Sequence, residues 1–225
     1  GSPDALSKNL LQEALRIHDE DREMCAQIGA WGADLLPNAA VVLTHCNTGS
    51  LATGGTGTAQ SVISRSWERR KLKHVYIDET RPLFQGARLT AWELQKLGIP
   101  STLITDDTAA FLMQRGLINV VVAGADRIAL NGDVANKVGT YNLAVLAHYH
   151  SIPMYIAAPT SSIDFEIEEG SGIPIEQRSA MEVVEINGKR IAPLDVEVYS
   201  PAFDITPHHL VNAIITEKGV LRPPY

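Results

Sequence analysis

The chain has 225 residues, 45% of them hydrophobic, and a formal net charge of −7. No stretch approaches the ~18 uninterrupted apolar residues that indicate a membrane-spanning helix, so we expect a globular protein with no membrane partner. A nucleic acid backbone needs a basic binding face, so the negative charge argues against a nucleic acid partner. A small phosphorylated ligand needs only a few local donors and is compatible with this charge.

The two cysteines, Cys25 and Cys46, cannot form a dense disulfide framework, and neither lies in a zinc-ligand pattern. We therefore expect a reducing, cytoplasmic location and no metal site. The chain starts with Gly1-Ser2 rather than Met and lacks the basic and apolar regions of a signal peptide. We expect it to be a processed or shortened form of a longer polypeptide.

The order of predicted elements indicates a Rossmann-like fold. A long helix is predicted over residues 5–36 and ends at Pro37. Short apolar strands then alternate with amphipathic helices. The strands are predicted at 41–43, 74–78, 102–105, 119–124 and 154–158, and the helices at 58–71, 85–97, 108–115 and 137–150. Strands without polar alternation, separated by helices, predict a doubly wound, mostly parallel α/β sheet covered on both faces.

The pattern changes after Pro159. Residues 160–181 hold acids and glycines and suggest a functional loop, and Asn187-Gly188 predicts a hairpin within 183–191. A last helix is predicted around 207–215, before Val220-Leu221. We divide the chain into a linker helix over 1–37, the remainder of a truncated helical domain, and a Rossmann-like catalytic domain over 38–225.

Polar side chains follow three of the predicted strands: Cys46, then 78–81, then Asp126-Arg127. Because parallel strands point the same way, these ends should meet at one edge of the sheet, where open α/β sheets bind ligands. Taken alone, Cys46 could be a small buried thiol, and Asp126 could cap a helix or pair with Arg127. His45 alternates to the other side of its strand, so a Cys46–His45 dyad is not expected.

A phosphate site is predicted at the same edge from three loops. The glycine-rich run offers Gly54, Gly55 and Thr56, and Asn136-Lys137 precedes a predicted helix start whose backbone N–H groups could bind an anion. Further donors could come from Gln85, Arg81 and Arg88. Taken singly, the two arginines could instead be surface ion-pair residues and Lys137 a solvated first-turn residue.

A dinucleotide fingerprint is the competing interpretation of the glycine-rich run. Gly55-Thr-Gly57 follows a strand and opens a helix, and Asp78-Glu79 lies at the spacing of a ribose-binding acid. The third glycine would fall on Gln60, and the loop from Cys46 is longer than that motif requires. We therefore disfavour a nicotinamide cofactor.

Four long segments resemble those of the methylthioribose-1-phosphate isomerase family. They are Thr-His-Cys-Asn-Thr-Gly-Ser-Leu-Ala-Thr at 44–53, Glu-Thr-Arg-Pro-Leu-Phe-Gln-Gly-Ala-Arg-Leu-Thr-Ala-Trp-Glu-Leu at 79–94, the run from Gly-Ala-Asp-Arg to Gly-Thr-Tyr at 124–141, and Pro-Ala-Phe-Asp-Ile-Thr-Pro at 201–207. The resemblance implies Cys46 and Asp126 as the catalytic pair, and Gln85, Asn136 and Lys137 as substrate contacts. It also implies a cofactor-free aldose–ketose isomerase of methionine salvage, acting on a phosphorylated sugar as a homodimer.

Two relatives of that family share its scaffold: ribose-1,5-bisphosphate isomerases, and the regulatory subunits of the exchange factor for translation initiation. The regulatory subunits generally lack the Cys/Asp pair, so Cys46 and Asp126 favour an enzyme. The family also has an N-terminal helical domain with an Arg-Gly-Ala-Pro segment that helps to bind phosphate, and this segment does not occur in the 225 residues.

The family reaction suggests a mechanism. The anomeric oxygen carries the phosphate, so the ring must open with acid help before hydrogen moves from C2 to C1. We hypothesise that Asp126, kept protonated by an apolar setting, donates to the ring oxygen while Cys46 handles the proton at C2. A local cation or backbone dipole should then lower the pKa of Cys46. A direct hydride shift is the alternative.

Overall fold

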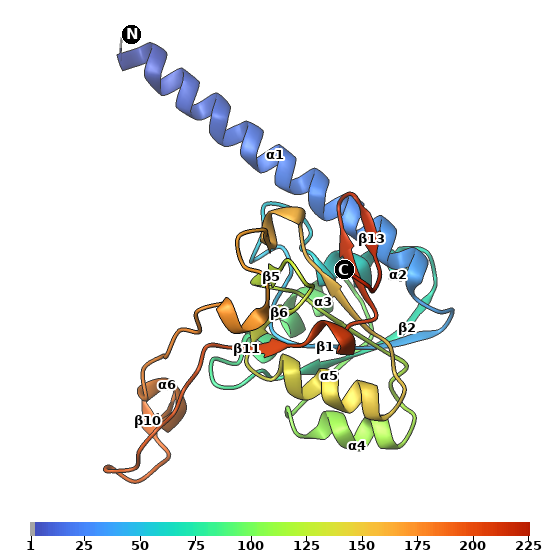
Figure 1. Cartoon of the computed structure of the whole chain (residues 1–225), viewed down its shortest axis with the longest axis vertical. Coiled ribbons are helices and arrows are strands. Elements are labelled where there is room, and N and C mark those ends of the chain that lie inside the picture. The colour runs from blue at the N-terminus through green and yellow to red at the C-terminus, as the bar shows by residue number, and fades with distance from the viewer. Residues whose placement is uncertain (1–2) are drawn as a thin grey trace.

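Seven strands form the main sheet of the computed structural model, which describes residues 3–225 (Figure 1). Across the sheet they are β13 (Gly219–Leu221), β12 (Ala213–Thr216), β7 (Met154–Ala157), β4 (Val120–Ala123), β1 (Ala40–Thr44), β2 (Leu72–Asp78) and β3 (Ser101–Ile104). Only β13 runs antiparallel to its neighbour, and all other neighbours are parallel. The doubly wound, mostly parallel sheet that the sequence predicts is therefore confirmed.

Helices cover both faces of this sheet. One face packs against α4 (Thr108–Gln114) and α5 (Thr140–Tyr149). The other face packs against α2 (Ala59–Glu68), α3 (Ala91–Lys96) and the end of α1 (Pro3–Leu35). Adjacent residues of one strand serve opposite faces, since Val121 belongs to the first core and Val122 to the second. This double burial explains why the strands carry apolar runs without polar alternation.

The predicted long helix is confirmed as α1, except that Gly1 and Ser2 of the 1–37 segment lie outside the described residues. Its first half extends away from the rest of the molecule (Figure 1), and its second half packs on α2. The contact is close because Gly29 and Gly32 face Ser61 and Val62, where an added Cβ would lie 2.4 and 2.3 Å from side-chain atoms. Among residues 3–225, no helix combines the length and apolar character that a membrane crossing needs.

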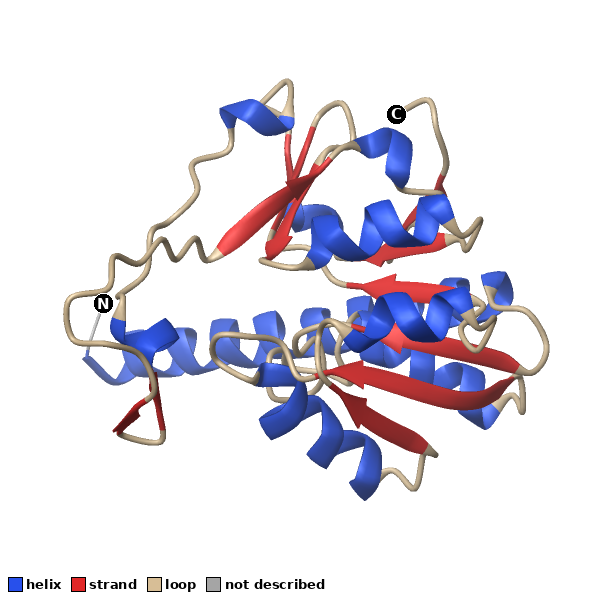
Figure 2. Cartoon of the chain, turned by 90° about the horizontal axis from the view of Figure 1, so that it is seen from below, coloured by secondary structure: helices blue, strands red, loops and turns tan. Residues whose placement is uncertain are grey.

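A second, four-stranded sheet lies beyond the carboxyl end of β4. It contains, in order, β11 (Phe203–Thr206), β6 (Val134–Lys137), β5 (Arg127–Ala129) and β8 (Ile163–Asp164). The predicted loop over 160–181 holds β8 and two short 3-10 turns, η2 (Thr160–Ser162) and η3 (Gly170–Gly172). The predicted hairpin is confirmed as β9 (Glu185–Ile186) and β10 (Lys189–Arg190), preceded by α6 (Met181–Val184), and it stands apart on long connections (Figure 2).

Two predicted helices are wrong in whole or in part. Residues 207–215 form only the single turn η4 (His208–Leu210) before entering β12, because Ala213–Thr216 is an apolar run buried on both faces beside β7. The predicted helix over 137–150 begins only at Thr140. Lys137 instead ends β6, which pairs with β11, and Gly139, with a φ of 107°, makes the turn into α5. The predicted helix over 85–97 is present as the π-helical turn η1 (Gly86–Thr90) followed by α3.

Candidate active site

A cavity of about 540 Å³ lies where the loops after β1 and β4 meet the small sheet. Five of the predicted site residues line it: Cys46, Gln85, Asp126, Asn136 and Lys137. They come from the loop after β1, the start of η1, the loop after β4 and strand β6. The remaining lining residues are Asp21, Asn47, Thr48, Leu51, Ala52, Thr53, Thr58, Leu89, Ala125, Pro159 and Phe203.

Cys46 occupies a strained turn at the end of β1. Its φ is 65°, in the left-handed region that residues with a side chain rarely adopt. Two threonine hydroxyls fix its backbone: Cys46 N–H donates to Thr80 Oγ1 at 2.8 Å, and Thr90 Oγ1 donates to the Cys46 carbonyl at 2.6 Å. Strain that is held by surrounding bonds in this way often marks a functional position.

The thiol of Cys46 is a weaker acid than the sequence analysis anticipated. Burial raises its pKa, and the nearby Asp126 carboxylate raises it further. A hydrogen bond from the Asn47 backbone and the charge of Lys137 act in the opposite direction but do not overcome burial. The expected net lowering of the Cys46 pKa is therefore wrong, and the thiol is protonated at neutral pH.

Asp126 lies at the mouth of the cavity and is exposed, and the expectation that its carboxyl group is kept protonated stays a prediction. Partial loss of hydration raises its pKa, and the positive charge of Lys137 lowers it. Lys137 thus acts electrostatically on both members of the predicted pair. The pKa values of Asp126 and Cys46 both rise, so each group holds its proton more firmly than it would in water.

Lys137 and Asn136 are buried at the end of β6, on the cavity wall. The ammonium group of Lys137 donates to the Ala202 carbonyl at 3.0 Å and lies 4.8 Å from the centre of the Phe203 ring. Asn136 Nδ2 donates to Thr140 Oγ1 at 2.9 Å. An ammonium group and an amide held side by side on one wall can bind a phosphate or a sugar hydroxyl.

Two backbone donors of the predicted anion cradle at the following helix start are already engaged within the protein, and the cradle stays a prediction. The Asp204 carboxylate already accepts from the Gly139 N–H at 2.7 Å and from the Tyr141 N–H at 3.1 Å. These are the backbone donors that an anion at the start of α5 would have used. The cavity therefore depends on side-chain donors at this point.

Gln85 offers an unused acceptor. Its Oε1 atom is buried and has no hydrogen-bond partner among residues 3–225. Buried polar atoms are rarely left without a partner, because desolvation is then uncompensated. A hydroxyl group of a ligand in the cavity would satisfy it.

The other predicted binding residues do not line this cavity. The Arg81 guanidinium donates to the Val183 carbonyl at 2.9 Å, and Arg88 donates to the Leu83 carbonyl at 3.0 Å. In the glycine-rich loop, the Gly54 amide donates to Asp21 and the Gly55 amide to Thr53 Oγ1.

Thr56 is the last of the predicted binding residues, and its hydroxyl pairs with Ser61 Oγ at 3.0 Å. Like the two arginines and the two glycine amides, it is engaged within the protein. The role of these five residues in binding stays a prediction.

Glu93 was missed by the sequence analysis although it organises the loop behind Cys46. This buried carboxylate accepts from Asn47 Nδ2 at 2.9 Å, from Ser50 N and Oγ at 2.7 Å each, and from Gln60 Nε2 at 3.1 Å. Gln60, which stands where a dinucleotide fingerprint has its third glycine, is buried in the first turn of α2 and bonded to this carboxylate. The glutamate lies inside the 79–94 segment, but nothing in its spacing marks it.

The lining residues that the sequence analysis did not assign to the site include Phe203 and Asp21. Phe203 lies in the 201–207 segment, and Asp21 comes from the middle of α1. Asp21 carries no local signal, because its contact with Gly54 joins parts of the chain 33 residues apart.

A larger cavity, of about 620 Å³, lies beside β3 and α3. Its lining contains Trp92, Gln95 and Leu103 but no acid, base or thiol. It therefore lacks the groups that acid–base chemistry requires.

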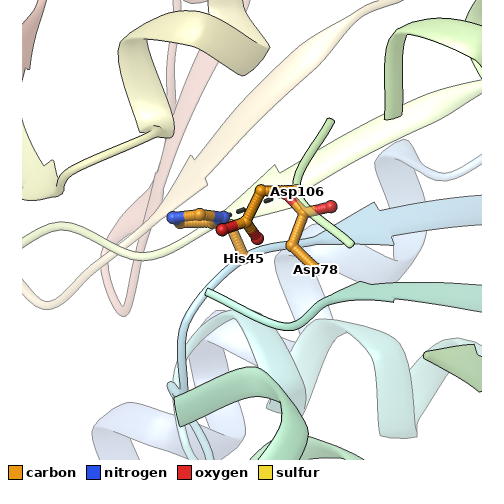
Figure 3. Close-up of side chains that lie close together, drawn as sticks. All are labelled: His45, Asp78 and Asp106. Carbon is orange, nitrogen blue, oxygen red and sulfur yellow. Dashed lines mark hydrogen bonds and ion pairs between the residues drawn. The ribbon is translucent and has the colours of Figure 1, made fainter. Parts of the chain in front are cut away.

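His45 does not pair with Cys46, in agreement with the strand alternation. Figure 3 shows its ring beside Asp78 and Asp106, in a cluster whose ligand-type atoms lie within 4.8 Å of one another. Both Asp106 oxygens accept backbone hydrogen bonds, from Thr80 N and Arg81 N at 2.8 Å each. Both Asp106 oxygens, both ring nitrogens of His45 and Asp78 Oδ2 thus have partners within the protein, and we do not assign a metal to the cluster.

Fold and cavity together define a doubly wound α/β domain with a buried thiol, a carboxylate and an ammonium group at one sheet edge. The chain belongs to the Initiation factor 2 subunit family (IF-2B), whose model matches residues 2–223. It is 58% identical over 222 residues to a methylthioribose-1-phosphate isomerase of Chloroflexus aurantiacus, a match that covers 99% of this chain and 64% of the relative. The chain therefore spans less than two thirds of the length of such relatives.

Solved structures agree with this assignment. A 5-methylthioribose 1-phosphate isomerase from Pyrococcus horikoshii superposes with a TM-score of 0.96 at 51% identity, covering 100% of this chain and 63% of that one. A structure described as translation initiation factor eIF-2B, subunit delta, from A. fulgidus superposes with a TM-score of 0.92 at 47% identity, covering 96% and 63%. The family resemblance that the sequence motifs indicated is confirmed.

Proposed function

We propose that this chain converts 5-methylthioribose 1-phosphate to 5-methylthioribulose 1-phosphate, an aldose–ketose isomerisation of methionine salvage, without a cofactor. The observation that supports it most is the single cavity lined by Cys46, Asp126, Gln85, Asn136 and Lys137. The identity of 58% with a named isomerase points to the same substrate.

The surroundings of the two groups favour one division of labour. Burial raises the pKa of Cys46 and so favours its protonated thiol, whereas Asp126 is exposed and the positive charge of Lys137 favours its carboxylate form. We therefore assign Cys46 as the general acid and Asp126 as the general base, the reverse of the hypothesis made from the sequence. This arrangement needs no rare protonation state.

The proton transfers balance on this assignment. Cys46 donates to the ring oxygen as its bond to C1 breaks, while Asp126 removes the proton from C2 and an enol forms. Asp126 then returns its proton to C1, and the Cys46 thiolate takes the proton of the C2 hydroxyl. The ketone forms, and both groups regain their starting state.

Binding is assigned to the remaining cavity residues. Lys137 and Asn136 would hold the phosphate or a neighbouring hydroxyl, and Gln85 Oε1 would accept from a sugar hydroxyl. Lys137 would also stabilise the negative charge that develops on Cys46 as the thiol gives up its proton, because it lowers the pKa of that group.

Turnover in deuterated water tests the proton route. Transfer through Asp126 predicts solvent deuterium at C1 of the product whenever the acid exchanges its proton before returning it. Complete absence of deuterium at C1, at every pH tried, would favour a hydride shift with Asp126 managing only the hydroxyl proton.

Direct assay of the chain tests the function itself. Cys46→Ser and Asp126→Asn should each abolish most turnover, whereas Cys25→Ser, which replaces the other free thiol, should not. Near-normal turnover by both site variants would reject the assignment. Ribose 1,5-bisphosphate, supplied in parallel, shows whether the substrate is instead the bisphosphate.

A regulatory or binding role is the second candidate, because the eIF-2B subunit delta of A. fulgidus is also a close structural match. The two candidates differ in whether the cavity turns over a sugar phosphate. If the chain binds the sugar phosphate but leaves it unchanged, with or without the additional residues that longer relatives contain, the regulatory role is favoured.

We also propose that the protein is a homodimer. Trp92, Leu97 and Leu103 are 48%, 51% and 48% exposed near the edge strand β3, and an apolar edge of this kind favours self-association. Sedimentation equilibrium checks this proposal. A monomer at micromolar concentration would contradict it.

A further inference from the structure

The side chain of His45, the residue before Cys46, is buried between two acceptors, of which Figure 3 shows Asp78. His45 Nδ1 lies 2.9 Å from Asp78 Oδ2, and His45 Nε2 lies 2.9 Å from the Val138 carbonyl oxygen. Both side chains of the pair are only 1% exposed. The carboxylate of Asp106 also faces the ring, and Asp204 lies within electrostatic reach.

The two hydrogen bonds of the pair require one proton in addition to the proton on His45 Nε2. A carbonyl oxygen only accepts, so Nε2 must donate to Val138. The contact between Nδ1 and Asp78 then needs a second proton, carried either by the ring or by the carboxyl group. Burial raises the pKa of Asp78 to about 6, and although burial alone would lower the pKa of His45, hydrogen bonding to Asp78 raises it. The pair therefore keeps its shared proton more readily than separate groups would.

The pair joins two walls of the cavity. Its aspartate ends β2. Two residues later lies Thr80, whose hydroxyl accepts from Cys46 N and donates to the Asp78 carbonyl at 3.0 Å. Its histidine reaches across to Val138, the residue after Lys137. The turn at Gly139 permits this contact, because an added Cβ there would lie 2.8 Å from the His45 ring.

We propose that His45 and Asp78 are positioning residues for the reaction. Their proton-sharing pair fixes the position of the strained turn at Cys46 relative to Asn136 and Lys137 on the other wall of the cavity. The inference rests on the proposed function for its kinetic part only. Neither side chain lines the cavity, so both act through the backbone of Cys46 and Val138.

Asp78→Asn and Asp78→Val separate positioning from general stability. An asparagine amide can donate to Nδ1 while Nε2 donates to Val138, so Asp78→Asn keeps both bonds without the extra proton. Asp78→Val, and His45→Phe with its similar ring volume, lose them. Both apolar variants should lower kcat by about ten- to a hundredfold, with KM changed by less than about threefold. Asp78→Asn should recover most of kcat. His148→Gln, on the exposed face of α5, is the matched control and should leave kcat unchanged.

Alkylation of Cys46 by iodoacetamide, followed by peptide mapping, tests the geometry without turnover. Release of the turn exposes the thiol, so Asp78→Val should raise the Cys46 alkylation rate, and Asp78→Asn and His148→Gln should not. Cys25 serves as the internal reference for global unfolding, because it is buried under α2 and reacts only if the fold opens.

The outcomes distinguish the two proposals. If the unmodified chain lacks isomerase activity, the proposed function fails, and the alkylation rates still decide the positioning role. If folded Asp78→Val keeps the wild-type kcat and alkylation rate, the positioning role is overturned. It is also overturned if Asp78→Asn is damaged as severely as Asp78→Val.

Discussion

Removal of the Glu93 carboxylate should destabilise the fold more than removal of any single surface charge. Four donors point at this group, which is 4% exposed: Asn47 Nδ2, the amide and hydroxyl of Ser50, and Gln60 Nε2. A buried donor left without its acceptor costs about 1–3 kcal/mol. At the low end of that range for each of the four, Glu93→Ala should lower the free energy of unfolding by about 4 kcal/mol, a large share of the total.

Glu93→Gln gives a graded version of the same experiment. A glutamine whose oxygen takes the place of Oε2 keeps the bonds to Ser50 and Gln60 and loses only that to Asn47, so the expected loss is about 1 kcal/mol. Glu68→Ala, at an exposed position of α2, is the matched control and should change stability by no more than about 0.5 kcal/mol. Urea denaturation measures all three. If Glu93→Ala is no less stable than Glu68→Ala, the carboxylate does not organise the loop and the reasoning is refuted.

Three further predictions concern charge and cofactor dependence. Lys137→Met removes a positive charge that lowers the pKa of both Cys46 and Asp126, so the pH at which Cys46 becomes half-alkylated at a fixed time should move upward; a downward shift would contradict the electrostatic role. Burial alone would raise the pKa of Asp133, but its hydrogen bonds, led by that of Asn131, lower it to about 2. The stability advantage of wild type over Asp133→Asn should therefore be complete above about pH 4 and shrink toward pH 2, as urea midpoints at pH 7 and pH 3 would show, and a pH-independent difference would contradict it. Turnover should survive dialysis against EDTA, and recovery only on addition of a divalent cation would refute the cofactor-free proposal.

Uninterrupted apolar runs made most of the fold predictable. The apolar run Val120–Ala123 predicts a strand of a parallel sheet, because such a strand is buried on both faces, and the structure confirms it. The same kind of run misled the prediction at Ala213–Thr216, because periodicity alone does not separate a short buried strand from a helix. Lys137 was placed in a helix because a strand ending in Asn-Lys has no apolar pattern, and its pairing with β11 lies about 66 residues away in sequence.

The candidate site was predictable where it follows from strand direction. Cys46 and Asp126 end neighbouring parallel strands, so topology alone brings them to one edge. The state of those groups was not predictable, because the pKa of a thiol depends on burial that only the packed structure defines. Nor could spacing reveal that Asp21 takes the amide of Gly54, or that Asp204 takes the amides at the start of α5.

The projecting part of α1 is connected to the cavity through Asp21, which lies in the same helix. Residues 3–20 of α1 are exposed and precede Asp21, which corresponds to roughly 27 Å of helix. Further along, at Gly29 and Gly32, the helix packs against α2 with no room for larger side chains, so this contact holds α1 on the domain. The Asp21 carboxylate accepts from the Gly54 amide, in the loop that forms one wall of the cavity. A protein bound or fused at the outer end of α1 and shifting the helix would therefore act on that wall through the contact between Asp21 and Gly54.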